Sequence, residues 1–108
     1  MIYNGARIVR QQDVDHIHPQ HLLNKRVVPY TRVNNIANLQ LLDSGTNRNE
    51  KRALELGDWI EKHVEEPIGY LSRHLIPSDK QLWKSENFDG FYEDRRRLII
   101  EKLRTVVA

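Results

Sequence analysis

The segment DVDHIHPQ, residues 13–20, combines aspartates, histidines and a proline, and these residue types suit metal-assisted hydrolysis. Hydrolysis of a phosphodiester needs a base that removes a proton from water and a cation that offsets the charge growing on the phosphate. A histidine titrates in the range that a general base requires, and an aspartate is a hard oxygen ligand for Mg²⁺. His16 is therefore a candidate base, and Asp15 is a candidate metal ligand.

A second oxygen ligand is available downstream, where an asparagine follows a predicted strand. The carboxamide of Asn47 would be presented by the first turn of the helix that follows the second strand. Because Mg²⁺ keeps several waters and needs only one or two protein oxygens, Asp15 and Asn47 are chemically sufficient as ligands. Mn²⁺ or another divalent cation fits the same pair.

The segments DVDHIHPQ and NIANLQLLDSGTNRNEK together resemble the HNH motif of the His-Me finger, or ββα-metal, nucleases. That motif contains Asp-His-Ile-x-Pro, an Asn-Leu pair on the second strand, and an Asn or His on the helix. The resemblance covers roughly residues 8–52. It implies that His16 is the general base, that Asp15 and Asn47 hold the metal, and that Asn38 braces the loop.

Two positions depart from the usual motif. Lys51 follows Asn47 by four positions, one more than the commonest spacing, so Asn49 remains an alternative metal ligand. His18 occupies a position that is often apolar in the family, which makes it a possible additional contact to metal or substrate. The basic residues around Asn47 are candidate contacts to the phosphates of nucleic acid: Arg48, Lys51 and Arg52.

The C-terminal segment FYEDRRRLIIEKL resembles the C-terminal domain of GmrSD-type restriction and phage-defence nucleases. This narrower resemblance implies a DNA endonuclease that acts as the effector of a bacterial defence system in the cytoplasm. It also implies that the 108-residue chain is a domain excised from a longer protein whose N-terminal part hydrolyses nucleotides. The sequence leaves RNA open as a substrate, and it does not indicate the oligomeric state.

The composition limits the other classes of protein. The chain is 39% hydrophobic and 30% charged, has no cysteine, and contains no apolar run of the roughly 20 residues that a membrane span needs. We therefore expect one domain without a membrane partner, disulfides or a cysteine-rich zinc site. A formal net charge of +2 permits binding to a polyanion but does not by itself predict it.

The expected fold is α+β, with a ββα-metal finger over approximately residues 8–56 and supporting helices over residues 57–108. β-favouring residues predict strands over residues 8–17 and 39–43, separated by a long, irregular connection. Apolar residues at helical intervals predict a helix over residues 48–64, interrupted near Gly57, then a short helix over residues 68–76 and a long one over residues 88–106. All of the candidate chemistry lies in the first half.

Two alternative functions remain open at this level. One is a nucleic-acid-binding module that keeps the finger but does not cleave. The other is a structural zinc module built on His16, His18 and His21, although the usual paired spacing of zinc ligands is missing. On the C-terminal helices, we expect His63 and His74 to be surface or half-buried residues, and the run 95–97 to be a solvated basic face or a phosphate contact.

Overall fold

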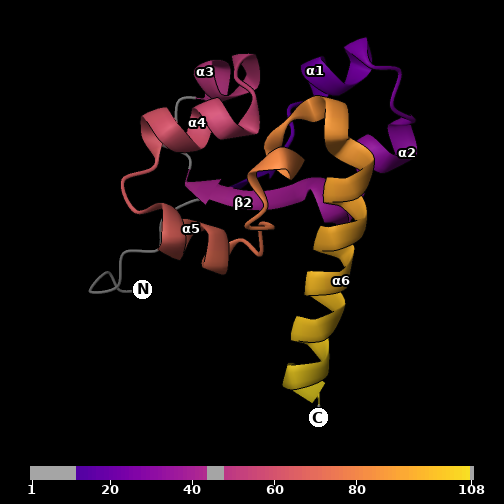
Figure 1. Cartoon of the computed structure of the whole chain (residues 1–108), viewed down its shortest axis with the longest axis vertical. Helices are drawn as coiled ribbons and strands as arrows, with labels where there is room; N and C mark the ends of the chain where they lie inside the picture. The colour runs from indigo at the N-terminus through magenta and orange to yellow at the C-terminus, as the bar shows by residue number, and fades with distance from the viewer. Residues whose placement is uncertain (1–11, 44–47, 108) are drawn as a thin grey trace, which may run out of the picture.

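The computed structural model describes residues 12–43 and 48–107, and within them the chain has the expected α+β architecture (Figure 1). One two-stranded antiparallel sheet packs against helices in this described part. The elements follow the chain in this order: β1 (Gln12–His16), α1 (Gln20–Lys25), α2 (Tyr30–Val33), η1 (Ile36–Asn38), β2 (Leu39–Asp43), α3 (Arg48–Ala53), α4 (Leu56–His63), α5 (Pro67–Arg73), η2 (Lys80–Trp83), η3 (Ser85–Asn87) and α6 (Phe88–Val107).

Strands β1 and β2 pair so that Asp15 lies opposite Gln40 and Val14 lies opposite Leu41. Because neighbouring residues of a strand face opposite sides, the Asp15–Gln40 pair is buried while Val14 and Leu41 are 57% and 52% exposed. The second strand matches its prediction. The first ends at His16, one residue before the predicted end, and the predicted strand residues 8–11 lie outside the described part.

The connection between the strands is more regular than the irregular loop that we predicted. It contains the short helices α1 and α2, and each begins directly after a proline, Pro19 or Pro29. Proline is tolerated at a helix start because the amide that it lacks would have no partner within the helix there. Leu23 and Val33 are buried and hold the two helices against the core. Helix propensities of single residues do not predict such tertiary contacts.

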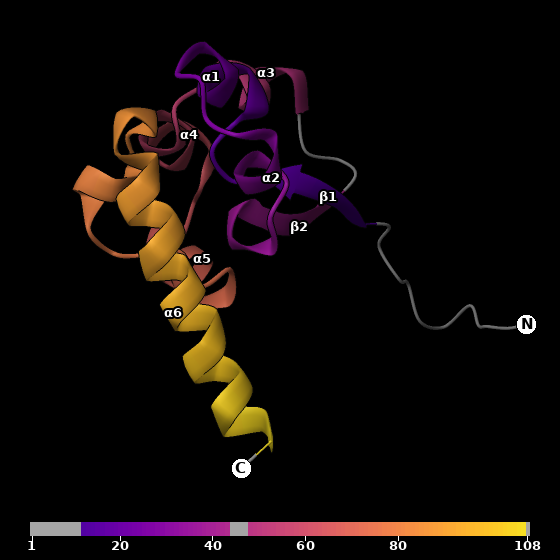
Figure 2. The ribbon, with the colours of Figure 1, turned by 90° about the vertical axis from the view of Figure 1, so that its right-hand side faces the viewer.

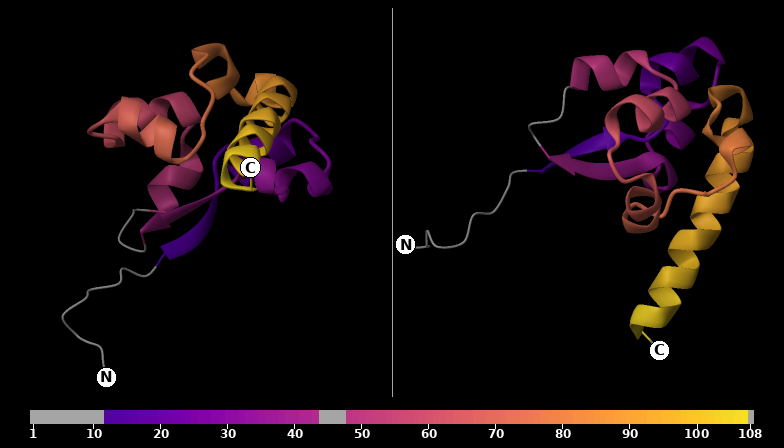
Figure 3. Two further views of the ribbon diagram at one scale, coloured as in Figure 1. Left: turned by 90° about the horizontal axis from the view of Figure 1, so that it is seen from below. Right: turned by 60° about the vertical axis from the view of Figure 1, so that its left-hand side comes forward.

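The predicted helix over residues 48–64 is divided into α3 and α4, and the break differs from the one that we expected. Gly57 lies inside α4, while the chain turns at Leu54 and Glu55. The carboxylate of Glu55 accepts hydrogen bonds from the backbone N–H of Ser85 at 2.7 Å and from its hydroxyl at 2.6 Å. A contact distant in sequence therefore accompanies the break, and helix α4 leaves α3 at an angle (Figures 1 and 3).

Helix α6 confirms the predicted long amphipathic helix and closes one side of the molecule (Figure 2). Phe88, Phe91 and Arg95 in its first half are buried, and its C-terminal turns extend beyond the rest of the fold (Figures 1 and 3). Arg95 is an exception to the solvated basic face that we predicted for residues 95–97. Its guanidinium donates to the carbonyl of Ile36 at 2.7 Å and to that of His74 at 3.0 Å, and only 5% of the residue is exposed.

His18 joins the segment after β1 to the C-terminal helices. Its side chain is fully buried, its Nε2 lies 2.9 Å from the carbonyl oxygen of Leu82, and its ring meets Phe88 and Phe91 edge-on. The core likewise draws on both parts, from Ile17 and Leu23 to Trp59 and Trp83. No helix within residues 12–43 and 48–107 combines the length and apolar character needed to span a membrane.

The burial of His18 predicts a specific pH dependence of stability. Burial lowers the pKa of this histidine from 6.5 to about 4, because the charged ring would lose its hydration. Between these values the unfolded chain binds a proton that the folded chain does not, so stability falls as the pH falls from 6.5 to about 4. We expect His18 to lower the free energy of unfolding by about 3 kcal/mol across this pH range, which urea denaturation at several pH values would measure.

Two glutamine variants separate this contribution from that of the other histidines. His18→Gln keeps an N–H donor for the carbonyl of Leu82 but cannot titrate, so its stability should depend less on pH than that of the wild type. The exposed His21 provides the matched control, and His21→Gln should keep the wild-type slope. Equal slopes for His18→Gln and the wild type would contradict this account.

Candidate active site

The candidate catalytic residues line a cleft at the end of strand β1. Asp15 is buried, His16 is half-buried, and the two lie in a cleft of roughly 400 Å³. The cleft is completed by side chains from α1 and α3, which pack against each other: Gln20, His21, Asn24, Lys51 and Arg52. Although adjacent strand residues normally face opposite sides, the strand ends at His16, and both residues contribute to one cleft.

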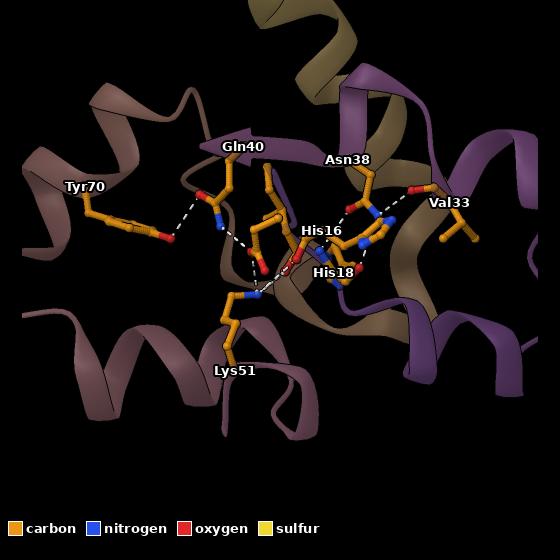
Figure 4. Close-up of polar contacts among 9 residues, drawn as sticks. His16, His18, Val33, Asn38, Gln40, Lys51 and Tyr70 are labelled. Carbon is orange, nitrogen blue, oxygen red and sulfur yellow. Dashed lines mark hydrogen bonds and ion pairs between the residues drawn. The ribbon is translucent and has the colours of Figure 1, made fainter. Parts of the chain in front are cut away.

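Lys51 holds helix α3 against the end of β1. Its ammonium donates to the backbone carbonyls of His16 at 3.1 Å and Ile17 at 3.0 Å, and lies 3.3 Å from Oδ2 of Asp15 (Figure 4). Desolvation lowers the pKa of Lys51, and the neighbouring Asp15 opposes this shift. We predicted Lys51 as a surface contact to phosphate, but it is only 1% exposed, and its donors already serve three protein oxygens. In this structure Lys51 is a buried residue that fixes helix α3 to the end of β1.

Asp15 is also held from the opposite side by an amide. Gln40 donates from Nε2 to Oδ2 of Asp15 at 3.1 Å, and its Oε1 accepts from the hydroxyl of Tyr70 at 3.0 Å (Figure 4). Both Gln40 and Tyr70 are buried, and desolvation raises the pKa of Tyr70, which keeps the phenol a donor. Lys51 and Gln40 thus meet the same oxygen of Asp15. Among the described residues Oδ1 has no partner, which leaves this oxygen available to a cation.

The side chain of His16 contacts an asparagine that the sequence did not single out. Nε2 of His16 lies 2.8 Å from Oδ1 of Asn34, which follows helix α2 on the connection between the strands. Asn34, Gln40 and Tyr70 are thus site residues that the sequence analysis missed. Asn34 and Gln40 carry neutral amides, which are common in loops and strands, and no spacing in the sequence marks either residue.

Asn38 closes the connection between the two strands. Its Oδ1 accepts from the backbone N–H of His18 at 2.9 Å, and its Nδ2 donates to the carbonyls of His18 at 3.1 Å and Val33 at 3.0 Å (Figure 4). All of these groups are buried, and Asn38 is not exposed at all. Asn38 thus ties the segment after β1 to the end of α2.

The remaining predicted site residues do not all lie at the cleft. Arg52 is exposed at the cleft, Arg48 and Asn49 lie in α3, and Asn47 lies outside the described residues. His18 points into the core rather than toward Asp15, so it is not placed to contact metal or substrate. Within the described chain no three His, Asp or Glu side chains converge as a metal site, and the zinc cluster of His16, His18 and His21 is not assembled.

No known protein-family model matches this chain, and no curated protein matches it either.

The buried position of Lys51 predicts a large loss of stability in Lys51→Met. The substitution leaves the carboxylate of Asp15 buried without its cation and removes a donor from two carbonyls. The free energy of unfolding should therefore fall by about 3–5 kcal/mol. Arg52→Met is the matched control, because Arg52 is the exposed neighbour on the same helix, and its effect should stay within about 0.5 kcal/mol. Urea denaturation measures both, and a similar stability for the two variants would contradict the internal role of Lys51.

The bonds of Asn38 predict a second large effect. Asn38→Ala removes three buried hydrogen bonds and should lower the free energy of unfolding by about 3 kcal/mol. Asn35→Ala removes one bond from the same connection, which the Asn35 side chain accepts from the backbone N–H of Ala37, and should lower it by about 1 kcal/mol. If thermal or urea denaturation gave equal losses, Asn38 would not be the principal brace of the connection.

Proposed function

We propose that this chain is a metal-dependent HNH-type endonuclease domain that hydrolyses phosphodiester bonds in DNA. The observation that carries this proposal is the juxtaposition of Asp15 and His16 in one cleft at the end of β1. One residue offers a carboxylate oxygen that has no partner among residues 12–43 and 48–107, and the other offers a half-buried imidazole. A hard oxygen ligand beside an imidazole is the pair of groups that metal-assisted phosphodiester hydrolysis needs.

The arrangement of elements supports a ββα-metal finger. Strand β1, strand β2 and helix α3 follow one another in the order of that motif, with a long connection between the strands. Lys51 fixes α3 to the end of β1, and Asn38 fixes the connection to the segment that follows β1. The finger thereby brings the helix that contains Asn49 close to the strand end that carries Asp15.

The donor set fits a divalent cation such as Mg²⁺ or Mn²⁺. Asp15 Oδ1 is one hard oxygen ligand, and Asn47 or Asn49 supplies a second, which is enough for a cation that keeps several waters. Such a cation would offset the negative charge that grows on the phosphate and on the leaving oxygen. Lys51 and Gln40 hold the other oxygen of Asp15 and so orient the carboxylate.

In the proposed reaction, the imidazole of His16 takes a proton from water as the water oxygen forms a bond to phosphorus. The bond between phosphorus and the 3′ oxygen breaks, and that oxygen leaves with the electron pair and is protonated from solvent. Arg52, exposed at the cleft, contacts the phosphate backbone and positions it without reading base sequence. A single site of this kind cuts one strand at a time, so nicking is the expected activity.

The sequence resemblance extends the proposal to the parent protein. We propose that the domain is the effector of a bacterial restriction or anti-phage system, acts in the cytoplasm, and is joined to an N-terminal nucleotide-hydrolysing domain. RNA remains a second possible substrate, because contacts to phosphate do not by themselves distinguish the two nucleic acids.

The ion pair between Lys51 and Asp15 favours one alternative, a nucleic-acid-binding module that does not cleave. A carboxylate that already has an ammonium at 3.3 Å attracts a further cation less strongly than a free carboxylate does. This alternative retains Arg52 and the cleft for binding to phosphate. It differs from the nuclease proposal in predicting DNA binding without cleavage under any metal condition.

Relaxation of supercoiled plasmid tests the proposed function. We expect nicking with Mg²⁺ or Mn²⁺, none with EDTA, and a loss of roughly 100-fold or more in His16→Ala, since a general base typically contributes this much. His63→Ala is the matched control, because His63 lies outside the cleft and pairs with Glu50, and it should retain the wild-type rate. Nicking that survives EDTA or His16→Ala would exclude this site as its source. DNA binding without nicking would favour the non-cleaving module.

The same assay identifies the second metal ligand. Asn47→Ala and Asn49→Ala are compared in nicking and in titration with Mn²⁺, and the variant of the true ligand should lose both activity and metal affinity. Equal retention in both variants would contradict a carboxamide ligand at either position.

A further inference from the structure

The amide of Asn34 has an orientation that the protein itself determines. Its Nδ2 donates to the carbonyl of Tyr30 at 3.3 Å, and its backbone N–H approaches the same oxygen at 3.1 Å. A carbonyl oxygen only accepts hydrogen bonds, so the NH₂ group of the amide must face Tyr30 and the oxygen must face the other way. That oxygen, Oδ1, lies 2.8 Å from Nε2 of His16.

This orientation settles which ring nitrogen of His16 carries the hydrogen. An amide oxygen can only accept, so Nε2 must be the donor in the pair, and the neutral ring must be the Nε2–H tautomer. Nδ1 then carries the lone pair. Within the described residues Nδ1 of His16 has no hydrogen-bond partner, whereas Nε2 is occupied by Asn34.

We propose that Asn34 is the positioning residue for His16: it fixes the Nε2–H tautomer, holds the ring in place, and leaves Nδ1 as the atom that accepts the proton from water. The use of this lone pair in hydrolysis rests on the function proposed above. In that step the proton moves from water to Nδ1 while the oxygen bonds to phosphorus, and the imidazolium later returns the proton to solvent. Asn34 Oδ1 continues to accept from Nε2 throughout.

Neighbouring contacts make the position of Asn34 well defined. The carbonyl of Val33 accepts from Asn38 Nδ2 at 3.0 Å, and Arg32 pairs with Asp89 of α6 at 2.8 Å. Consecutive residues at the end of α2 therefore contact the brace of the connection, the C-terminal helix and His16. The exposed Arg32–Asp89 pair adds little energy, so the buried contact from Asn38 is the stronger restraint.

His18 provides an internal reference for a test in solution. Its Nε2 lies 2.9 Å from the carbonyl of Leu82, so it must also be the Nε2–H tautomer, but for a reason independent of Asn34. A change in Asn34 should therefore alter the ring nitrogens of His16 and leave those of His18 unchanged.

The first measurement is the tautomer of His16 by ¹⁵N NMR on the full chain, at a pH about two units above the usual histidine pKa of roughly 6.5. The signals are assigned by their absence in His16→Gln. We expect the Nε2–H tautomer in the wild type, and mixed tautomers in Asn34→Leu, which has a similar size but no acceptor. A wild-type His16 with its hydrogen on Nδ1 would overturn the proposal without any variant being needed, and so would an unchanged His16 spectrum in a folded Asn34→Leu.

The second measurement is plasmid nicking by the same variants. Asn34→Leu should lose roughly 10- to 100-fold in rate, the range seen when a side chain that orients a functional histidine is removed. Asn34→Asp retains an acceptor for Nε2–H and should recover most of the rate and the wild-type tautomer. Asn35→Ala changes the same connection without contacting His16 and should have little effect on either. Full activity in Asn34→Leu would overturn the positioning role.

The two measurements separate this inference from the function on which it rests. If the wild type and every variant fail to nick but the tautomer of His16 depends on Asn34, the nuclease proposal is wrong and the positioning contact stands. If the wild type nicks and His16 is essential, but neither the tautomer nor the rate depends on Asn34, the function stands and the inference is wrong.

Discussion

The site depends on the contacts of the Lys51 ammonium with the end of strand β1. An amine that is 1% exposed loses its hydration, which is unfavourable unless protein oxygens replace the water. Two carbonyls at the end of β1 and the carboxylate of Asp15 supply those oxygens, and all of them belong to residues 15–17. In the observed docking of helix α3 the buried charge is fully paired. This pairing brings the strand end and the helix together as one cleft.

The same interaction also limits how the site can bind a cation. Lys51 and Gln40 both contact Oδ2 of Asp15, so the charge of the carboxylate is partly balanced before any metal arrives. A cation at Oδ1 then gains less from Asp15 than it would from an isolated carboxylate. For the proposed nuclease, metal affinity would therefore depend more heavily on the second ligand and on the phosphate of the substrate.

Much of the fold was predictable from the sequence, because it depends on local pattern. Strand β2 was predicted from its residue types and helix α6 from the helical spacing of its apolar residues, and the prediction for α6 was right in extent as well as in type. The division between α3 and α4 was not predictable, since the contact of Glu55 with Ser85 is distant in sequence. The burial of Lys51 and Arg95 was missed for the same reason. Basic side chains usually mark a solvated face, and only distant carbonyls make their burial tolerable.

His16 and His18 show why the candidate site could be predicted only in part from the sequence. In a continuous strand, residues two apart would share a face, and both histidines would have reached the cleft. Because β1 ends at His16, His18 instead turns into the core against Phe91, where Leu82 accepts from its ring. The motif singled out Asp15 and His16, but two of the side chains that contact them are neutral amides, at positions 34 and 40. Such partners are selected by geometry alone, so the sequence could nominate the reactive groups and not the residues that hold them.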